Sequence, residues 1–206
     1  SSAASDVYKR QLIYLETERL ILRDYTKDDA EEYSRLMADD EVMYYLQDIQ
    51  HHSREESEKY FADILQDIRG KDRCRYFLHM QKKDTKEQIG SIGYTVMDTT
   101  PVGKLVHLGY FTYPKFWGCG YVTEALEKVM DFAFSKGGVY RITTGCLKEN
   151  RGSERVMQKC GMIREAEHVD YEWHDGKMKT RMEYRMLKSD WESIPCRAKR
   201  ACRRHE

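Results

Sequence analysis

The chain has 206 residues, and its 35 Lys plus Arg residues are balanced by 35 Asp plus Glu residues, so its formal net charge at pH 7 is zero. This balance argues against a protein that binds nucleic acid through bulk positive charge. With 40% hydrophobic residues, 34% charged residues and three prolines, the composition is that of a globular domain. Because no run reaches the roughly 18 apolar residues of a membrane-spanning helix, and no signal-peptide pattern is found, we expect a cytoplasmic protein without a membrane role.

The charge is unevenly distributed along the chain. Residues 1–11 and 196–206 together hold seven basic and two acidic residues, which leaves 28 basic and 33 acidic residues between them. We interpret 1–11 as a disordered or non-native segment, 12–191 as one domain and 192–206 as a basic, disordered tail. A nucleic-acid role for the basic end is the alternative, although the composition favours a protein without a nucleic-acid partner.

The six cysteines form no C-x-x-C pair and no regular spacing with the seven histidines. This pattern argues against a structural zinc site, and we predict no metal. In a chain of this kind the cysteines are expected to be reduced thiols.

The first part of the domain predicts one strand followed by two helices. The strand covers residues 15–23, where a β-type run ends in alternation. Thr26 with Asp29, and Ser53 with Glu56, each form a capping-box pattern. Apolar residues follow both patterns at helical spacing, so a helix is expected after each of them.

The remainder predicts three neighbouring strands and then alternating helices and strands. The expected elements are strands at 74–81, 89–97 and 105–113, a helix at 122–136, a strand at 141–147, a helix at 152–160, and a hairpin of strands 163–173 and 179–187 around Asp175-Gly176. Together they predict a mixed α/β fold. Its sheet has about seven mostly antiparallel strands with one parallel crossover, and about four helices cover both faces.

The segment most informative about chemistry is GYFTYPKFWGCGYVTEA, residues 109–125. A strand leads into Pro114, which cannot donate to a sheet ladder, and Gly118 and Gly120 then form a turn that opens directly into a helix. Converging backbone N–H groups and a helix N-terminus suit a phosphate or pyrophosphate.

The sequence of this turn is also compatible with three other interpretations. The glycines can simply make a tight strand-to-helix connection. A dinucleotide-binding Rossmann site is disfavoured because the turn follows a meander and lacks the full G-x-G-x-x-G pattern. A nucleoside triphosphatase is disfavoured because no Gly-Lys-Ser/Thr follows.

At residues 114–125 the sequence resembles the GNAT N-acetyltransferases, and within them the ribosomal-protein N-terminal acetyltransferases of the Rim type. The family pattern Q/R-x-x-G-x-G/A is represented by residues 115–120, with Lys115 where many members have Gln, Arg or an acid. Three further segments agree: ETERLILR at 16–23, IGSIGY at 89–94 and N-x-x-S-x-x-V-x-x-K-x-G at 150–161. The resemblance covers residues 15–191.

The resemblance implies acetyl-CoA as cosubstrate and direct attack by an amine, without an acetylated enzyme. It implies that the strand at 109–113 pairs with the pantetheine and polarises the thioester carbonyl, and that the following turn cradles the pyrophosphate. The cofactor-binding residues expected on this basis are Tyr110, Phe111, Thr112, Trp117, Gly118, Cys119, Gly120, Tyr121, Val122, Thr123, Asn150 and Ser153.

The resemblance also indicates which residues donate a proton to the leaving thiolate and accept one from the amine. In similar enzymes the position of Ser153 contacts the cofactor, and its hydroxyl can protonate the leaving thiolate, although Asn150 and Ser153 also suit helix N-capping. Many relatives use a tyrosine as acid where this chain has Met157, so the donor is Ser153, water or none. The expected base is Glu172, with Asp170 and Glu167 as similar nearby carboxylates.

The sequence thus predicts transfer of acetyl from acetyl-CoA to a primary amine, either a protein N-terminus or a small amine, by a monomer or homodimer. Two alternatives remain at this stage. One is a non-catalytic acyl-CoA-binding or sensing module of the same fold. The other is covalent catalysis through Cys119, which the resemblance disfavours.

Overall fold

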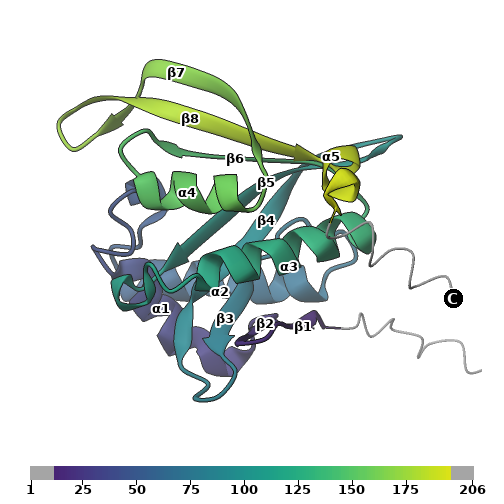
Figure 1. Cartoon of the computed structure of the whole chain (residues 1–206). Helices are drawn as coiled ribbons and strands as arrows, with labels where there is room; N and C mark the ends of the chain where they lie inside the picture. The colour runs from purple at the N-terminus through teal and green to yellow at the C-terminus, as the bar shows by residue number, and fades with distance from the viewer. Residues whose placement is uncertain (1–11, 196–206) are drawn as a thin grey trace, which may run out of the picture.

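The computed structural model describes residues 12–195, which form one eight-stranded sheet in the order β1-β2-β3-β4-β5-β6-β8-β7 (Figure 1). All neighbouring strands are antiparallel except β5 and β6, which are parallel. The strands are β1 (Tyr14–Glu16), β2 (Leu20–Arg23), β3 (Leu78–Lys82), β4 (Gln88–Thr100), β5 (Gly103–Thr112), β6 (Val139–Leu147), β7 (Ile163–His174) and β8 (Lys177–Leu187). The parallel pair is the predicted crossover.

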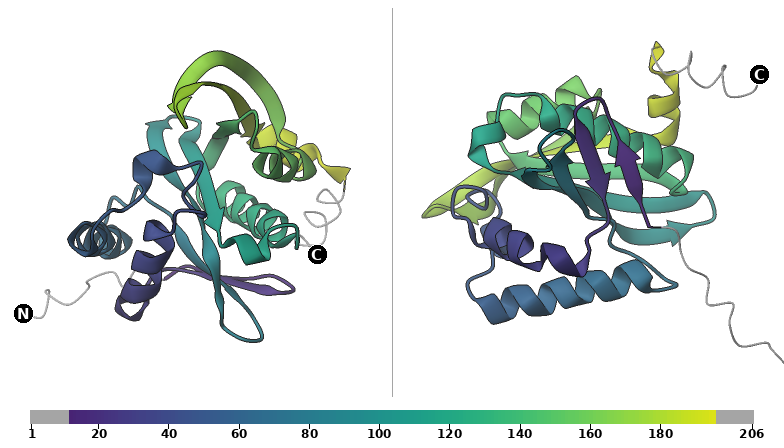
Figure 2. Two further views of the ribbon diagram at one scale, coloured as in Figure 1. Left: turned by 90° about the vertical axis from the view of Figure 1, so that its left-hand side faces the viewer. Right: turned by 90° about the horizontal axis from the view of Figure 1, so that it is seen from below.

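Helices cover both faces of the sheet, with α1 and α2 on one side and α3 and α4 on the other (Figure 2). Their bounds are α1 (Ala30–Ala38), α2 (Arg54–Arg69), α3 (Tyr121–Ser135), α4 (Arg151–Lys159) and α5 (Lys188–Ser193). The side chain of Ser53 accepts a hydrogen bond from the Glu56 N–H, as the capping pattern predicts. Short 3-10 turns lie at Lys27–Asp29, Gln47–Ile49 and Pro114–Phe116.

Two apolar cores result from this layering. The larger core packs α3 and α4 against the sheet and contains Leu126, Met130 and Met157, all fully buried. The smaller core joins α1 and α2 to the other face through Leu36, Phe61 and neighbours. The buried faces follow the apolar spacing of the sequence, so hydrophobic burial selects this arrangement.

The predicted mixed α/β fold is confirmed, with differences at three places. The strand expected at 74–81 is confined to Leu78–Lys82. The segment expected as one strand at 15–23 is split into β1 and β2, because Thr17 forms a turn that bonds Leu20 through both its backbone N–H and its hydroxyl. The fold also continues past 191 through α5, and Ile194 packs against the larger core. The Asp175-Gly176 turn has both φ angles positive, as the hairpin pattern requires.

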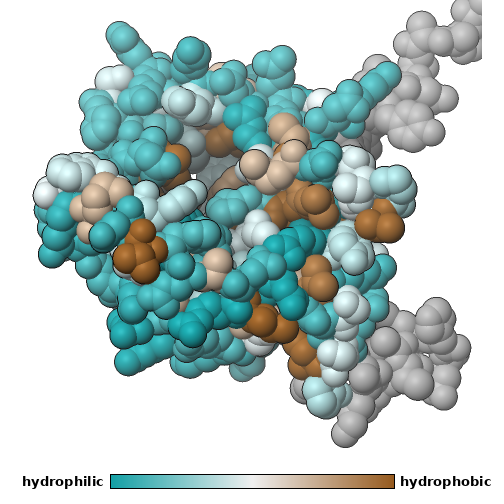
Figure 3. Space-filling model, turned by 90° about the horizontal axis from the view of Figure 1, so that it is seen from above, coloured by the Kyte–Doolittle hydropathy of each residue, from teal (hydrophilic) through white to brown (hydrophobic). Residues whose placement is uncertain are grey.

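On the face seen in Figure 3, most side chains are hydrophilic and the hydrophobic ones occur in small groups. No helix among residues 12–195 is long and apolar enough to cross a membrane. The basic residues expected to form a tail at 196–206 lie outside the described part of the chain.

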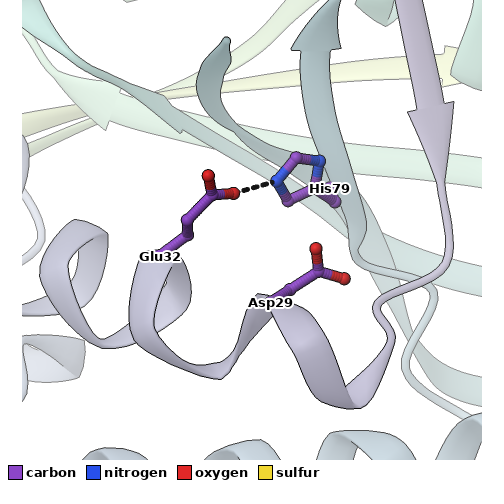
Figure 4. A group of neighbouring side chains, drawn as sticks. All are labelled: Asp29, Glu32 and His79. Atoms are coloured by element: carbon purple, nitrogen blue, oxygen red, sulfur yellow. Dashed lines mark hydrogen bonds and ion pairs between the residues drawn. The ribbon is translucent and has the colours of Figure 1, made fainter. Parts of the chain in front are cut away.

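A polar cluster of Asp29, Glu32 and His79 links the start of α1 to strand β3 (Figure 4). Both Asp29 oxygens bind the Arg23 guanidinium at 2.7 and 2.8 Å, and Asp29 also accepts from the Thr26 N–H at 2.7 Å. His79 bonds Glu32 at 2.9 Å. Since Arg23 already neutralises Asp29, this cluster is a structural link, and we assign no metal to it.

Asp29 is expected to make acid stability pH-dependent. Burial alone would raise the pKa of this carboxyl, but Arg23 and the Thr26 N–H outweigh it and hold the pKa at about 2, against an ordinary value of 3.8. A lowered folded pKa stabilises the protein above pH ~4, and this contribution disappears as the pH falls toward 2. Asp29→Asn should therefore lower the free energy of unfolding at pH 7 by about 2 kcal/mol and flatten its dependence on pH between 4 and 2.

The measurement is urea unfolding at several pH values, with Asp28→Asn as the matched control because Asp28 is exposed in the same turn. Equal pH dependence in the wild-type and Asp29→Asn proteins would contradict this account.

Candidate active site

The site begins where strands β5 and β6 diverge. Their parallel pairing ends at His107 and Thr143, although β5 continues to Thr112 and β6 to Leu147. Each strand keeps its other, antiparallel partner over this stretch. The facing edges of β5 and β6 therefore present backbone N–H and C=O groups to the gap rather than to each other.

A cavity of about 740 Å³, here called the central cavity, occupies this gap. Its walls are the diverging strands, the turn before α3, one side of α4 along its length, and part of the loop between α1 and α2. The predicted residues on its wall are Tyr110, Phe111, Thr112, Trp117, Gly118, Gly120, Tyr121, Val122, Thr123, Asn150 and Ser153. Tyr45, which precedes the turn by more than 70 residues in the sequence, lies on the same wall.

The turn before α3 presents backbone donors to the central cavity. Gly118 and Gly120 have φ angles of +72° and +79°, a conformation that favours glycine. Helix α3 begins at Tyr121, so the N–H groups of Tyr121, Val122 and Thr123 have no acceptor within the helix. These donors and the helix dipole create a site for an anion.

Arg19 contacts this turn from the connection between β1 and β2, 100 residues away in the sequence. Its Nη1 donates to the Cys119 carbonyl at 3.0 Å, and its Nε donates to Glu124 of α3 at 2.7 Å. The guanidinium also lies over the Tyr121 ring, 4.4 Å from the centroid. Because the Cys119 carbonyl is held by Arg19, the conformation of the glycine turn is fixed before any ligand binds.

Helix α4 forms the opposite wall. Asn150 caps it by accepting the Ser153 N–H at 3.2 Å, which agrees with the capping interpretation of the sequence. Arg151, Arg155 and Lys159 recur at helical spacing along the cavity wall. Arg151 pairs with Glu154, whereas Arg155 and Lys159 have no ion-pair partner within residues 12–195. Their positive charge is therefore available to a ligand.

Tyr110 and Ser153 bring two hydroxyls together at the cavity wall. The Tyr110 hydroxyl lies 2.8 Å from Ser153 Oγ and 3.1 Å from the Ser153 carbonyl, to which it can only donate. Burial raises the pKa of Tyr110, so its phenol stays protonated at neutral pH. The pair can act as a short proton relay opening onto the cavity.

The loop between α1 and α2 meets the β7–β8 hairpin on the other side of the cavity. Tyr45 lines the cavity and stacks on His174, with ring centroids 5.7 Å apart. Tyr44 packs edge-on against His174 and donates to Asp175 at 3.4 Å. Glu41 and Leu46 from the same loop also line the cavity. This loop thus forms the end of the same cavity that faces the hairpin, and this end is called the loop compartment.

Two predicted residues are not on the cavity wall. Cys119 is exposed in the turn, and its thiol contacts the Trp117 carbonyl at 3.6 Å. Glu172 lies on β7, and Arg181 binds its Oε2 at 2.8 Å. A different cysteine, Cys146, does line the cavity, but burial raises the pKa of its thiol to about 11, which makes it a poor nucleophile at pH 7.

The sequence interpretation missed several residues of the site. Arg19 carries no local signal, because its partners are far away in the chain. Arg155 and Lys159 could have been found from their spacing with Arg151. His107 could have been found as a polar residue between the apolar Val106 and Leu108 of a predicted strand.

Comparison with known families now decides the class of protein. The family model described as the acetyltransferase (GNAT) domain matches residues 19–163. The chain belongs to the GNAT acetyltransferase family. It is 32% identical over 165 residues to the N-acetyltransferase YoaA of Bacillus subtilis, covering 79% of this chain and 89% of YoaA. This GNAT protein is therefore an acyltransferase, as the resemblance predicted.

Solved structures of GNAT enzymes share its fold. A spermidine N-acetyltransferase from Vibrio cholerae in complex with CoA and spermine has a TM-score of 0.74 and 16% identity, covering 85% of this chain and 99% of that one. A ribosomal-protein-S5-alanine acetyltransferase from Vibrio fischeri has a TM-score of 0.74 and 19% identity, covering 87% and 98%. At these identities the likeness concerns the fold.

Arg19→Met tests whether acetyl-CoA binding requires Arg19 to stabilise the glycine turn. This change removes the hydrogen bond to the Cys119 carbonyl, so acetyl-CoA affinity measured by calorimetry should fall about tenfold, the equivalent of about 1.4 kcal/mol. Lys115→Met is the matched control, because Lys115 neighbours the turn but its Nζ binds Glu87 at 2.6 Å. Equal effects of the two substitutions would contradict a specific role for Arg19.

Proposed function

We propose that this GNAT protein transfers the acetyl group of acetyl-CoA to a primary amine by direct attack in the central cavity. The observation that carries the proposal is the gap between β5 and β6, with a donor-rich turn and unpaired cations on its walls. These features suit a long ligand that has a phosphate end and an amide-containing arm.

The phosphate end of CoA is expected at the turn before α3. The N–H groups at Gly118–Thr123 would bind the pyrophosphate, and Arg155 and Lys159 would contribute positive charge from α4. A cavity of about 740 Å³ agrees with the size of typical cofactor sites. These features support acetyl-CoA as cosubstrate.

The amide-containing arm would then lie along β5. The β5 backbone from Gly109 to Thr112 has no strand partner on the β6 side, so its N–H and C=O groups can pair with the pantetheine amides and polarise the thioester carbonyl. Ser153, backed by the Tyr110 hydroxyl, would deliver a proton to the sulfur as the C–S bond breaks.

The acceptor amine would enter from the loop compartment. Glu41 and the Tyr45 ring on this wall suit a protonated amine through charge and cation–π contact. The solved relatives act on spermidine and on a ribosomal protein. We therefore propose a small polyamine or a protein N-terminus as the acceptor class.

The decisive assay is thiol release from acetyl-CoA in the presence of an amine panel that includes spermidine and a basic peptide with a free N-terminus. At least one amine should increase thiol release and gain 42 Da, the mass of an acetyl group, by mass spectrometry. Binding of acetyl-CoA without transfer to any amine would instead favour the non-catalytic module.

Gly118→Glu should abolish measurable acetyl-CoA binding in calorimetry, because a carboxylate would face the pyrophosphate. Gly118→Ala is the matched control: a Cβ at this position meets no atom within 4 Å, so the variant tests the positive φ angle without the charge. If Gly118→Glu binds acetyl-CoA as tightly as Gly118→Ala does, the pyrophosphate assignment is wrong.

Ser153→Ala should lower kcat about tenfold and leave KM for acetyl-CoA unchanged, since it removes the proton donor but keeps the backbone N–H that Asn150 accepts. Tyr110→Phe should lower kcat less, because the serine hydroxyl remains. Steady-state kinetics with the best amine of the panel provides the measurement. An unchanged kcat in Ser153→Ala would exclude this serine as the donor.

A further inference from the structure

His107 occupies a distinctive position in the sheet. It is the last residue of β5 that pairs with β6, and it lies on the wall of the central cavity. Val106 and Leu108 on either side are buried in the core beneath α3. Because side chains alternate along a strand, His107 points to the face opposite Val106, Leu108 and Tyr110. The imidazole and the Tyr110–Ser153 pair thus flank the gap from opposite faces.

Thr143 of β6 orients the imidazole. Its hydroxyl donates to the Val106 carbonyl at 3.2 Å, and the same oxygen lies 3.5 Å from His107 Nδ1. Since the single hydroxyl proton is used by Val106, the oxygen can only accept from Nδ1. This favours the tautomer with the proton on Nδ1 and the lone pair on Nε2. No hydrogen bond within residues 12–195 occupies Nε2.

Desolvation at the cavity wall, more than nearby charge, favours the neutral imidazole. Burial lowers the pKa of His107 below its ordinary value of 6.5, Glu183 of β8 opposes this shift, and Arg181 of β8 adds to it. The effect of Glu183 is reduced because its Oε1 accepts from Arg181 Nε at 2.6 Å. The acids on the cavity wall are Glu41, from the α1–α2 loop, and Glu149, which is paired with Lys179 at 2.6 Å. At pH 7 His107 is therefore able to accept a proton.

We infer that His107 is the catalytic residue that takes the proton from the acceptor amine, through Nε2, directly or through one water molecule. This inference rests on the proposed function. The amine nitrogen forms the new C–N bond, the C–S bond of the thioester breaks, and the proton on nitrogen passes to His107. The thiolate of CoA takes a proton from the Ser153 hydroxyl, which regains one from solvent through Tyr110, while His107 releases its proton to solvent. Overall, a neutral amine and the thioester give an amide and a thiol, with one proton moved from nitrogen to sulfur.

The predicted base Glu172 fits this role less well. It is absent from the cavity wall, and Arg181 binds one of its oxygens. The Oε2 of Glu172 is therefore occupied by the Arg181 guanidinium. His107 has no such partner on Nε2 and lies on the cavity wall. Substitutions of His107 and Glu172 can therefore be compared directly to identify the base.

The test compares His107→Gln with Glu172→Gln. In the wild-type protein, kcat should fall at low pH with an apparent pKa below 6.5. His107→Gln should lower kcat about 100-fold and remove this pH dependence, with acetyl-CoA affinity by calorimetry unchanged within twofold. Glu172→Gln should keep the pH dependence. In His107→Ala, added imidazole should restore part of kcat, which a structural role would not produce.

A second variant, Thr143→Val, keeps the side-chain shape but removes the oxygen that orients Nδ1. It should lower kcat several-fold with little change in KM, and it provides a test even if His107 variants fold poorly. The inference is overturned if His107→Gln retains kcat within threefold and the wild-type pH profile, or if the pH dependence disappears in Glu172→Gln instead. Absence of transfer by the wild-type protein to every amine would overturn the proposed function as well.

Discussion

The site depends on one constraint, the separation of two parallel strands that each remain bound to another partner. Beyond His107 and Thr143, β5 is still paired with β4 and β6 is still paired with β8. Neither strand can therefore relax to close the gap without breaking a ladder on its far side. The free-energy cost of leaving these β5–β6 hydrogen bonds unmade is part of folding. The exposed strand edges are therefore available to a ligand without further rearrangement.

The elements next to the gap also determine the shape of the site. Pro114 starts a short 3-10 turn directly after β5, and the Trp117 indole donates to the Thr112 carbonyl at 3.1 Å. The chain thus turns sharply into α3, which directs its N-terminus at the cavity. The electrostatics of the site are local: fixed N–H dipoles act there, together with two cations of α4 that have no ion-pair partner among residues 12–195, while the chain as a whole is neutral.

Much of the fold and of the phosphate end of the site could be predicted from sequence, because both depend on short-range patterns. Apolar spacing and turn residues predicted the strands, the crossover and the β7–β8 hairpin, and the Gly118–Gly120 turn predicted the cavity wall before α3. Residues that act across long sequence separations could not be found this way. Arg19 reaches a turn 100 positions away, and the role of His107 depends on where a neighbouring strand stops pairing. The ion pair between Glu172 and Arg181 could not be predicted from the sequence either, because it depends on how β7 and β8 pair.

The central claim is that a preformed turn and an unpaired strand edge bind CoA through backbone groups. Amide chemical shifts measured by NMR during a CoA titration test it directly, because each backbone N–H is observed separately. The account predicts the largest shifts at Gly118, Gly120 and Thr123 and along Gly109 to Thr112, with Arg19→Met reducing those of the turn. Unchanged amides at these positions in a CoA-saturated protein would contradict it.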